Sequence, residues 1–285
     1  MRIIRGRNAV VTGAASGIGR AIARALATEG ANLFLMDRDH VGLAQTAQEI
    51  GARGVRVEVA VCDLATPAEV TQALSRLRQM WSDVHILVNC AGIISFGAFH
   101  LTEDDVWRRM LAVNLLAPMQ IVHELLATLL RVDEAHIVNV CSFVGLVPAR
   151  KVPVYQTSKH GLVGFTLALR YEYYSEKFGV TAVCPGFVCT PMLQNVPGPE
   201  AHKAPAGVPE ALTTTAEAVA ARTLDAIRRN EGIVAITPLA RWAWWLWRFS
   251  PRFVDWFLRQ GCRHIGHFRI FAPVKAAELP PPRAS

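Results

Sequence analysis

The sequence predicts one α/β domain in which helices cover both faces of a doubly wound parallel sheet of seven strands. Two observations predict this class: short apolar runs rich in Val, Ile and Leu recur along the chain, and stretches with helical spacing of apolar residues lie between them. Alternating strands and helices imply a parallel sheet, and right-handed crossovers place helices on both of its faces. The composition agrees, because 52% hydrophobic and 19% charged residues over 285 positions exclude disorder, collagen and a coiled coil.

The elements follow in chain order. The expected strands are the apolar runs Asn8–Thr12, Ala31–Met36, Val55–Val61, His85–Asn89, His136–Cys141, Val180–Cys184 and Gly232–Ile236. Long helices are expected to begin near Val106 and near Pro153. Residues 1–237 then form one domain, in which the loop 186–213, rich in Pro, Gly and Ala, follows a strand and is expected to be a lid over the site.

The net charge indicates which classes of partner the protein suits, and the cysteine content indicates its cellular compartment. The formal charge is +7, and six arginines against one acid between Pro238 and Phe271 account for +5 of it. A basic balance suits nucleic acid, an anionic membrane surface or an anionic small molecule. The six cysteines form no CxxC pair and the N-terminus has no apolar run of secretory length, so we expect a reduced, cytoplasmic protein. The histidines lack metal-ligand spacing, so no metal is expected.

A glycine-rich turn directly follows the first expected strand. It reads Thr-Gly-Ala-Ala-Ser-Gly-Ile-Gly over residues 12–19 and opens into a helix. Glycines there let the backbone approach a pyrophosphate, and the helix N-terminus supplies N–H donors and partial positive charge. This context predicts a dinucleotide-binding Rossmann fold, in which the cofactor-binding residues of the turn are Gly13, Ser16, Gly17, Ile18 and Gly19.

The end of the second strand bears on the choice between NAD and NADP. Asp37 stands eighteen residues after Gly19, where a carboxylate accepts hydrogen bonds from the adenosine ribose. A carboxylate there repels a 2′-phosphate and favours NAD. Arg38 keeps NADP as an alternative, because its guanidinium suits stacking on adenine or a contact to phosphate.

A tyrosine and a lysine stand four residues apart after a helix-start proline. Pro153 precedes Tyr155 and Lys159, which therefore share one helical face. A phenol ordinarily titrates near 10, and an ammonium about 4 Å away supplies roughly 4 kcal/mol of stabilisation to a phenolate at an effective dielectric of 20. The pair therefore suits general acid/base chemistry.

With these residues in place, the chain from Arg7 to about Thr237 resembles the short-chain dehydrogenase/reductase family. The glycine turn resembles TGxxxGxG, residues 89–92 resemble its NNAG with Cys90 in place of the second Asn, Tyr155 and Lys159 form YxxxK, and residues 185–190 resemble PGxxxT. The resemblance implies a catalytic tetrad of Asn114, Ser142, Tyr155 and Lys159. It implies that Tyr155 and Lys159, as well as the glycine turn, contact the cofactor. The further cofactor contacts that it implies are Asp63, Leu64, Asn89, Ala91, Gly92, Pro185, Gly186, Val188 and Thr190.

The resemblance also implies a mechanism and an assembly. Tyr155 exchanges the proton with the substrate oxygen, while Lys159 stabilises the phenolate and binds the nicotinamide ribose. Ser142 orients the substrate oxygen, and Asn114 holds a water that links Lys159 to solvent. Dimers or tetramers assembled through the long helices are implied as well.

The segment after the last strand, residues 238–285, departs from the short tail typical of the family. It carries five of the seven tryptophans, interleaved with arginines, and predicts two short amphipathic helices joined at Ser250–Pro251, with a frayed end at Leu279–Ser285. Peripheral membrane contact through residues 238–271 is one interpretation. A lid over a hydrophobic substrate, a dimer cap and plain packing remain open beside it.

The expected function is hydride transfer between NAD and a small lipophilic secondary alcohol or ketone, without a nucleic-acid partner. One alternative is an NADPH-dependent carbonyl or 3-oxoacyl-type ketoreductase, if Arg38 outweighs Asp37. Another is a non-catalytic cofactor sensor or a nucleic-acid-binding protein, because arginine and tryptophan together also stack on bases.

Overall fold

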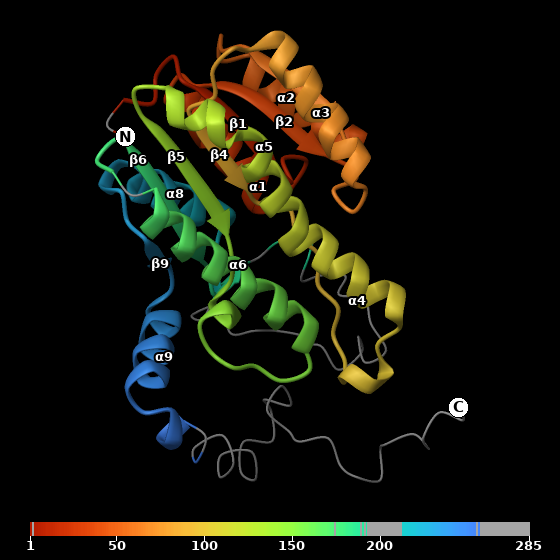
Figure 1. The fold of residues 1–285 in the computed structure, drawn as a ribbon, viewed down its shortest axis with the longest axis vertical. Helices are drawn as coiled ribbons and strands as arrows, with labels where there is room; N and C mark the ends of the chain where they lie inside the picture. Colours follow the sequence, from red (N-terminus) through yellow and green to blue (C-terminus); the bar gives the residue numbers. More distant parts are fainter. Residues whose placement is uncertain are drawn as a thin grey trace.

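A computed structural model describes residues 1, 3–173, 175–188, 190, 192, 213–254 and 256, and their centre is a seven-stranded sheet (Figure 1). Its strands are β1 (Asn8–Thr12), β2 (Asn32–Asp37), β3 (Val57–Val61), β4 (Ile86–Asn89), β5 (Ala135–Val140), β6 (Phe178–Cys184) and β9 (Ile233–Ala235). They lie in the order β3-β2-β1-β4-β5-β6-β9, and every neighbouring pair is parallel. The predicted doubly wound sheet is confirmed.

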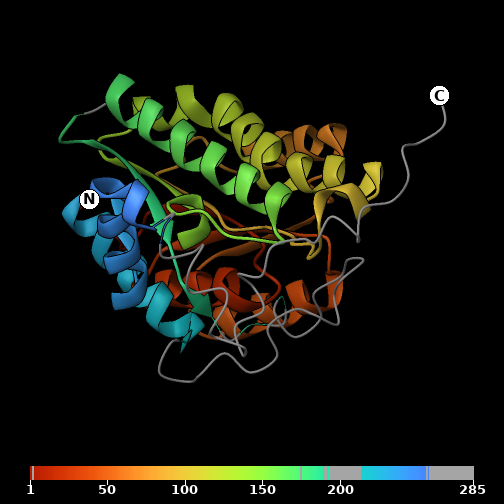
Figure 2. The same ribbon diagram turned by 90° about the horizontal axis from the view of Figure 1, so that it is seen from below.

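Helices cover the sheet on both faces (Figure 2). One face carries α1 (Gly17–Thr28), α2 (His40–Gly51) and α8 (Ala216–Arg229), and the other carries α3 (Pro67–Met80), α5 (Ala117–Arg131) and α6 (Pro153–Glu172). Successive strand residues point to opposite faces, so Ala9 and Val11 of β1 belong to one core and Val10 to the other. The strands are apolar throughout because both faces are buried.

The remaining described elements are short or flank the site. They are η1 (Phe99–Leu101), α4 (Asp104–Leu111), η2 (Ala112–Leu116), η3 (Phe143–Gly145), β7 (Phe187–Val188), β8 (Thr213–Thr214) and α9 (Pro238–Phe249). In the predicted lid, only 186–188, 190, 192 and 213 lie within the described residues, and the tail beyond residue 256 lies outside them.

The helical stretch Asp104–Arg131 is long and apolar enough, by length and composition, to cross a membrane. It consists of α4, η2 and α5 in succession. Its side chains Val113, Ile121 and Leu125 are fully or almost fully buried in the core beneath the sheet. Packing against the sheet therefore accounts for part of its apolar character, while Leu116, Met119 and Leu130 of the same stretch are exposed.

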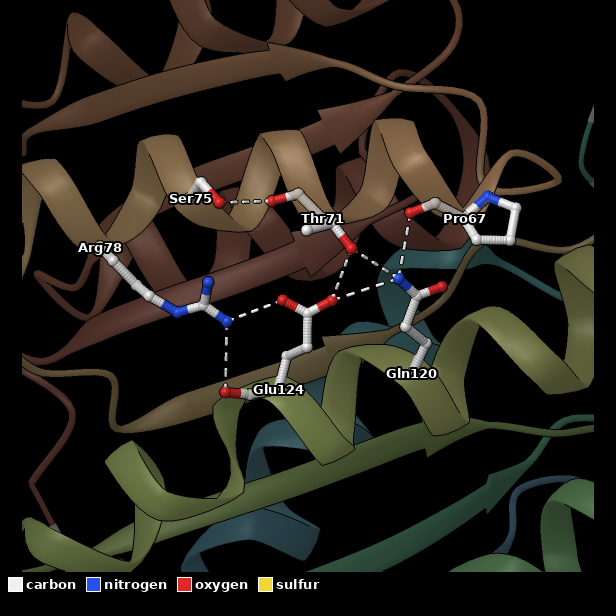
Figure 3. Close-up of polar contacts among 6 residues, drawn as sticks. All are labelled: Pro67, Thr71, Ser75, Arg78, Gln120 and Glu124. Atoms are coloured by element: carbon white, nitrogen blue, oxygen red, sulfur yellow. Dashed lines mark hydrogen bonds and ion pairs between the residues drawn. The ribbon is translucent and has the colours of Figure 1, made fainter.

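A polar network joins α3 to α5 on the outer side of that core (Figure 3). The carboxylate of Glu124 accepts hydrogen bonds from Arg78 at 2.7 Å, from Thr71 at 2.9 Å and from Gln120 at 3.2 Å. Gln120 also donates to the Pro67 carbonyl at 3.0 Å. Burial raises the pKa of Glu124, but the three hydrogen bonds outweigh it and hold the pKa below its usual value. The ionised carboxylate thus ties two neighbouring helices together.

We expect Glu124→Gln to lower the free energy of unfolding at neutral pH by about 1 kcal/mol, because it removes the charge from several hydrogen bonds. A carboxyl whose pKa is lowered by folding contributes stability above its unfolded value, and that contribution disappears as the pH falls through the folded value. The difference between variant and wild type should therefore shrink below about pH 4. Denaturant titrations at both pH values, with exposed Glu176→Gln as control, measure it; a pH-independent difference would contradict the assignment.

Candidate active site

A crevice is expected where the order of the strands reverses. From β1 the chain builds outward through β2 and β3 on one side, and from β4 through β5, β6 and β9 on the other. In open parallel sheets, ligands bind beyond the carboxyl ends of the strands at this switch point. The residues that follow β1 and β4 therefore define the centre of the candidate site.

The turn after β1 tolerates no side chain at two of its glycines. Gly13 has φ +70°, and a Cβ there would lie 2.7 Å from the Cα of Ala91. A Cβ on Gly19 would lie 2.1 Å from the Gly13 carbonyl oxygen, so α1 begins directly against the turn. Thr12 adds a polar link, because its hydroxyl accepts hydrogen bonds from the N–H groups of Cys90 at 3.0 Å and Ala91 at 3.2 Å.

The start of α1 is suited to an anion. The exposed N-cap residue Ser16 makes no side-chain hydrogen bond to the helix, so its hydroxyl leaves the first N–H groups of α1 uncovered. Gly17 has φ +53°, and Ile18 packs its half-buried side chain on the core. Thr190 reaches across, with its Cγ2 3.3 Å from the position of a Cβ on Gly17. The uncapped N–H groups at the start of α1, next to the glycine turn, suit the pyrophosphate of a dinucleotide.

Asp37 lies beside the same turn. One carboxylate oxygen accepts a hydrogen bond from the Ala15 N–H at 3.0 Å, and the other accepts one from the Asp39 N–H at 3.0 Å. Each oxygen keeps a further lone pair for a ribose hydroxyl. The neighbouring Arg38 is exposed at the rim.

Asp63, expected at the adenine, is already engaged with a protein cation. Its carboxylate accepts hydrogen bonds from Arg109 of α4 at 2.7 Å and from the Ala65 N–H at 3.0 Å. Partial burial raises the pKa of Asp63, but these bonds outweigh it and hold the pKa below its usual value. Leu64 beside it is 8% exposed. The sequence reasoning did not identify Arg109, whose partner is 46 residues away along the chain.

The loop after β4 lies between the glycine turn and the group formed by Asn114 and Lys159. Asn89 is buried and its amide donates to Asn139 of β5 at 2.9 Å. Cys90 has its pKa raised to about 12 by burial, so its thiol stays protonated. A Cβ on Gly92 would lie 3.4 Å from Asn114 Oδ1 and 3.5 Å from Lys159 Nζ, which places both polar groups around this glycine.

Tyr155 and Lys159 point toward each other from the first turns of α6. Lys159 Nζ lies 5.8 Å from the centre of the Tyr155 ring, and the lysine side chain is 3% exposed. The ammonium donates a hydrogen bond to the Val140 carbonyl at the end of β5, at 2.9 Å. A buried cation needs such a partner. Two further N–H groups remain for other acceptors.

Asn114 is held in a π-helical turn, η2, between α4 and α5. Its amide accepts from the Ile93 N–H at 2.8 Å and donates to the Ile93 carbonyl at 2.9 Å and to the Ser158 hydroxyl at 3.1 Å. Ser158 in turn donates to the Tyr155 carbonyl at 2.7 Å. The sequence reasoning gave Ile93 and Ser158 no role, although Ser158 directly precedes Lys159. π-Turns of this kind often occur at functional sites.

Ser142 lies two residues after the end of β5, is 8% exposed, and accepts a hydrogen bond from the Val144 N–H at 3.4 Å. The thiol of the buried Cys184 donates to the Ala182 carbonyl oxygen at 3.9 Å and also contacts Cys141. The Cys141 contact and burial raise the pKa of Cys184 well above its usual value.

The strand-end segment after β6 borders the same edge. Pro185 accepts a hydrogen bond from the Phe143 N–H at 2.8 Å. A Cβ on Gly186 would lie 2.6 Å from the Thr237 hydroxyl, and Val188 is buried in the core next to α1. The carboxyl edge of the sheet therefore brings together the glycine turn, Thr190, Gly92 and the Asn114–Lys159 group.

Comparison with known proteins agrees with this geometry. Residues 7–201 match the family described as short chain dehydrogenase. The chain is 41% identical over 190 residues to a candidate ketoacyl reductase of the granaticin polyketide synthase from Streptomyces violaceoruber, covering 66% of this chain and 70% of that one. It is 32% identical over 192 residues to the D-beta-hydroxybutyrate dehydrogenase of Cupriavidus necator, covering 67% and 74%.

Solved structures resemble it over most of its length. A short-chain dehydrogenase/reductase from Burkholderia phymatum in complex with NAD superposes with a TM-score of 0.80 at 26% identity, covering 89% of this chain and 97% of that one. The L-sorbose reductase of Gluconobacter frateurii, complexed with NADPH and L-sorbose, superposes with a TM-score of 0.72 at 25% identity, covering 82% and 95%. Because the family pattern covers more than half of the chain and the fold agrees, the protein belongs to the short-chain dehydrogenase family of nicotinamide-dependent oxidoreductases.

Proposed function

We propose that this protein interconverts a lipophilic secondary alcohol and its ketone with NAD as the preferred cofactor. The observation that carries the proposal is the Tyr155–Lys159 pair, held at the carboxyl edge of the sheet beside the bare glycine turn. When bound, the nicotinamide cofactor supplies or accepts the hydride. In this proposal residues 1–237 form the catalytic domain, with 186–213 as its lid.

Tyr155 is the proposed general acid/base and acts through its phenol oxygen. The Lys159 ammonium favours the phenolate and offers its remaining N–H groups to the nicotinamide ribose. Ser142 holds the substrate oxygen by its hydroxyl. Asn114 keeps the loop after β4 and the start of α6 in register, and the space beside Gly92 between Asn114 and Lys159 is where a relaying water fits.

The proposed dinucleotide contacts come from the ends of five strands, β1, β2, β3, β4 and β6. Gly13, Ser16, Gly17, Ile18 and Gly19 hold the pyrophosphate, and Asp37 holds the adenosine ribose. Asp63 and Leu64 border the adenine, while Asn89, Ala91, Gly92, Pro185, Gly186, Val188 and Thr190 border the nicotinamide half.

Apolar side chains near Ser142 support a lipophilic substrate. Phe143 and Phe187 lie with their ring centres 5.6 Å apart. Phe143 also packs against a buried apolar cluster that contains Leu146 and Val147. Phe99 is 60% exposed on the loop after β4. Ser95 and Phe96 on the same loop are buried.

A second candidate is an NADPH-dependent ketoacyl reductase. Its support is the 41% identity to a candidate ketoacyl reductase and the exposed Arg38 beside Asp37.

A homo-oligomer through the long helices is also proposed, supported by the exposed Leu116, Met119 and Leu130. A cytoplasmic location is proposed with it.

We expect Tyr155→Phe to lower turnover at least about 100-fold while the affinity for NADH stays within about twofold, because the ring remains and only the proton-transferring oxygen is lost. Secondary alcohols with NAD and ketones with NADH, graded from polar to apolar, serve as substrates. Tyr171→Phe, at a tyrosine that is 84% exposed, is the matched control. Near-normal turnover of Tyr155→Phe would exclude this tyrosine as the acid/base.

Parallel titrations with NADH and NADPH test Asp37. The wild type should bind NADH more tightly, and Asp37→Asn should weaken NADH binding about tenfold, because a hydrogen bond to a charged group is worth roughly 1.5–3 kcal/mol. The same change should improve NADPH binding, because it removes the repulsion of the 2′-phosphate. Asp225→Asn on α8 is the control. Tighter binding of NADPH by the wild type would favour the ketoacyl reductase candidate.

A further inference from the structure

Helix α9 presents large apolar side chains on both of its sides. Its inner side, formed by Ala240, Ala243, Trp244 and Trp247, packs on the core cluster around β6 and β9. Its outer face, defined by Trp242, Trp245, Leu246 and Phe249, is exposed, with Trp242 at 76% and Phe249 at 70%. Packing against the domain therefore accounts for only half of the apolar side chains of this helix.

The outer face is ordered within itself. Trp245 and Phe249, one helical turn apart, stack with ring centres 5.0 Å apart and planes inclined by 16°. The chain continues through Ser250 into a helical turn at 251–254, where Phe253 is also exposed and contacts Trp256 at 5.9 Å. Aromatic rings thus extend beyond the end of α9 as well.

The charge beside these rings has one sign. Arg241, Arg248 and Arg252 are exposed, and residues 238–254 contain no aspartate or glutamate. On a helix, positions 241 and 248 lie seven residues apart, so the two arginines form one flank along the outer face. Aromatic rings beside a row of cations suit the headgroup level of an anionic bilayer.

The length of α9 rules out a membrane span, and its charge disfavours a contact between two copies. Twelve residues of α-helix extend about 18 Å, and the hydrocarbon core of a bilayer is about 30 Å thick, so α9 is too short to span it. In a twofold contact between copies the same patch would face itself and place arginine opposite arginine. An anionic lipid surface meets both the rings and the cations.

We infer that the outer face of α9 docks the protein on an anionic lipid bilayer, with the helix lying in the headgroup plane. The helix starts shortly after β9, at the carboxyl edge of the sheet (Figure 1). Its N-cap residue Thr237 lies beside Gly186, where an added Cβ would be 2.6 Å from the threonine hydroxyl. Docking therefore holds the edge that carries Tyr155 and the glycine turn close to the lipid. Under the proposed function, a lipophilic substrate would then reach the site from the membrane.

The test is flotation of the full chain with vesicles of phosphatidylcholine alone and of phosphatidylcholine with 30 mol% phosphatidylglycerol. The wild type should float with the anionic vesicles, and the bound fraction should fall as salt is raised. NADH binding in the absence of vesicles is measured on every sample. Because this measurement does not involve lipid, it shows whether the sample is folded and binds the cofactor. A failure of docking is therefore distinguishable from a failure of the proposed function.

Two variants separate the rings from the cations. Trp242→Ser with Phe249→Ser removes exposed rings, and its control, Ile3→Ser with Val41→Ser, removes exposed apolar side chains elsewhere. Arg241→Gln with Arg248→Gln should weaken binding to anionic vesicles about 30-fold. Its control is Arg76→Gln with Arg131→Gln, which removes the same charge from α3 and α5.

Docking is supported if both α9 variants lose vesicle binding and both controls keep it. The inference is overturned if the wild type does not float, or if the α9 variants float as well as the controls. It is equally overturned if the wild type is a dimer that ignores vesicles and the ring variant is a monomer, because the outer face is then an interface between copies.

Discussion

The turn after β1 touches the loop after β4 so closely that a single methyl group at Gly13 would collide with the backbone of Ala91. This contact sets the distance between the two halves of the sheet at the point where the strand order reverses. Thr12 secures it with hydrogen bonds from Cys90 and Ala91. Because α1 starts against the same turn, its N-terminus can point only at the space between the halves, where a pyrophosphate would lie.

The catalytic half depends on that loop in turn. Asn114 binds the backbone of Ile93 through two hydrogen bonds and reaches Ser158 with a third, so the loop after β4, the π-turn and α6 are one hydrogen-bonded unit. The Lys159 ammonium of this unit donates in turn to the Val140 carbonyl at the end of β5. Its orientation beside Tyr155 is consequently fixed by backbone atoms, which do not change rotamer.

The C-terminal helix extends the same edge of the sheet. Its inner tryptophans complete the core beside β9, and its outer tryptophans are left exposed next to arginines. One short helix thus serves the packing of the domain and carries a surface of different chemistry. Because α9 begins at the carboxyl edge of the sheet, beside Gly186, the proposed lipid contact and the proposed lipophilic substrate are compatible with each other.

The seven strands and the glycine turn follow from the sequence alone, because apolar runs and glycine spacing are local signals that the buried sheet and the tight turn require. The likeness of Tyr155 and Lys159 to a catalytic pair is equally local. The partners of these groups are not: Ile93 for Asn114, Val140 for Lys159 and Arg109 for Asp63 lie 19 to 46 residues away along the chain. The division of the α9 tryptophans between core and surface also required the tertiary structure. Helical spacing separates two sides, but only the position of the sheet decides which side is buried.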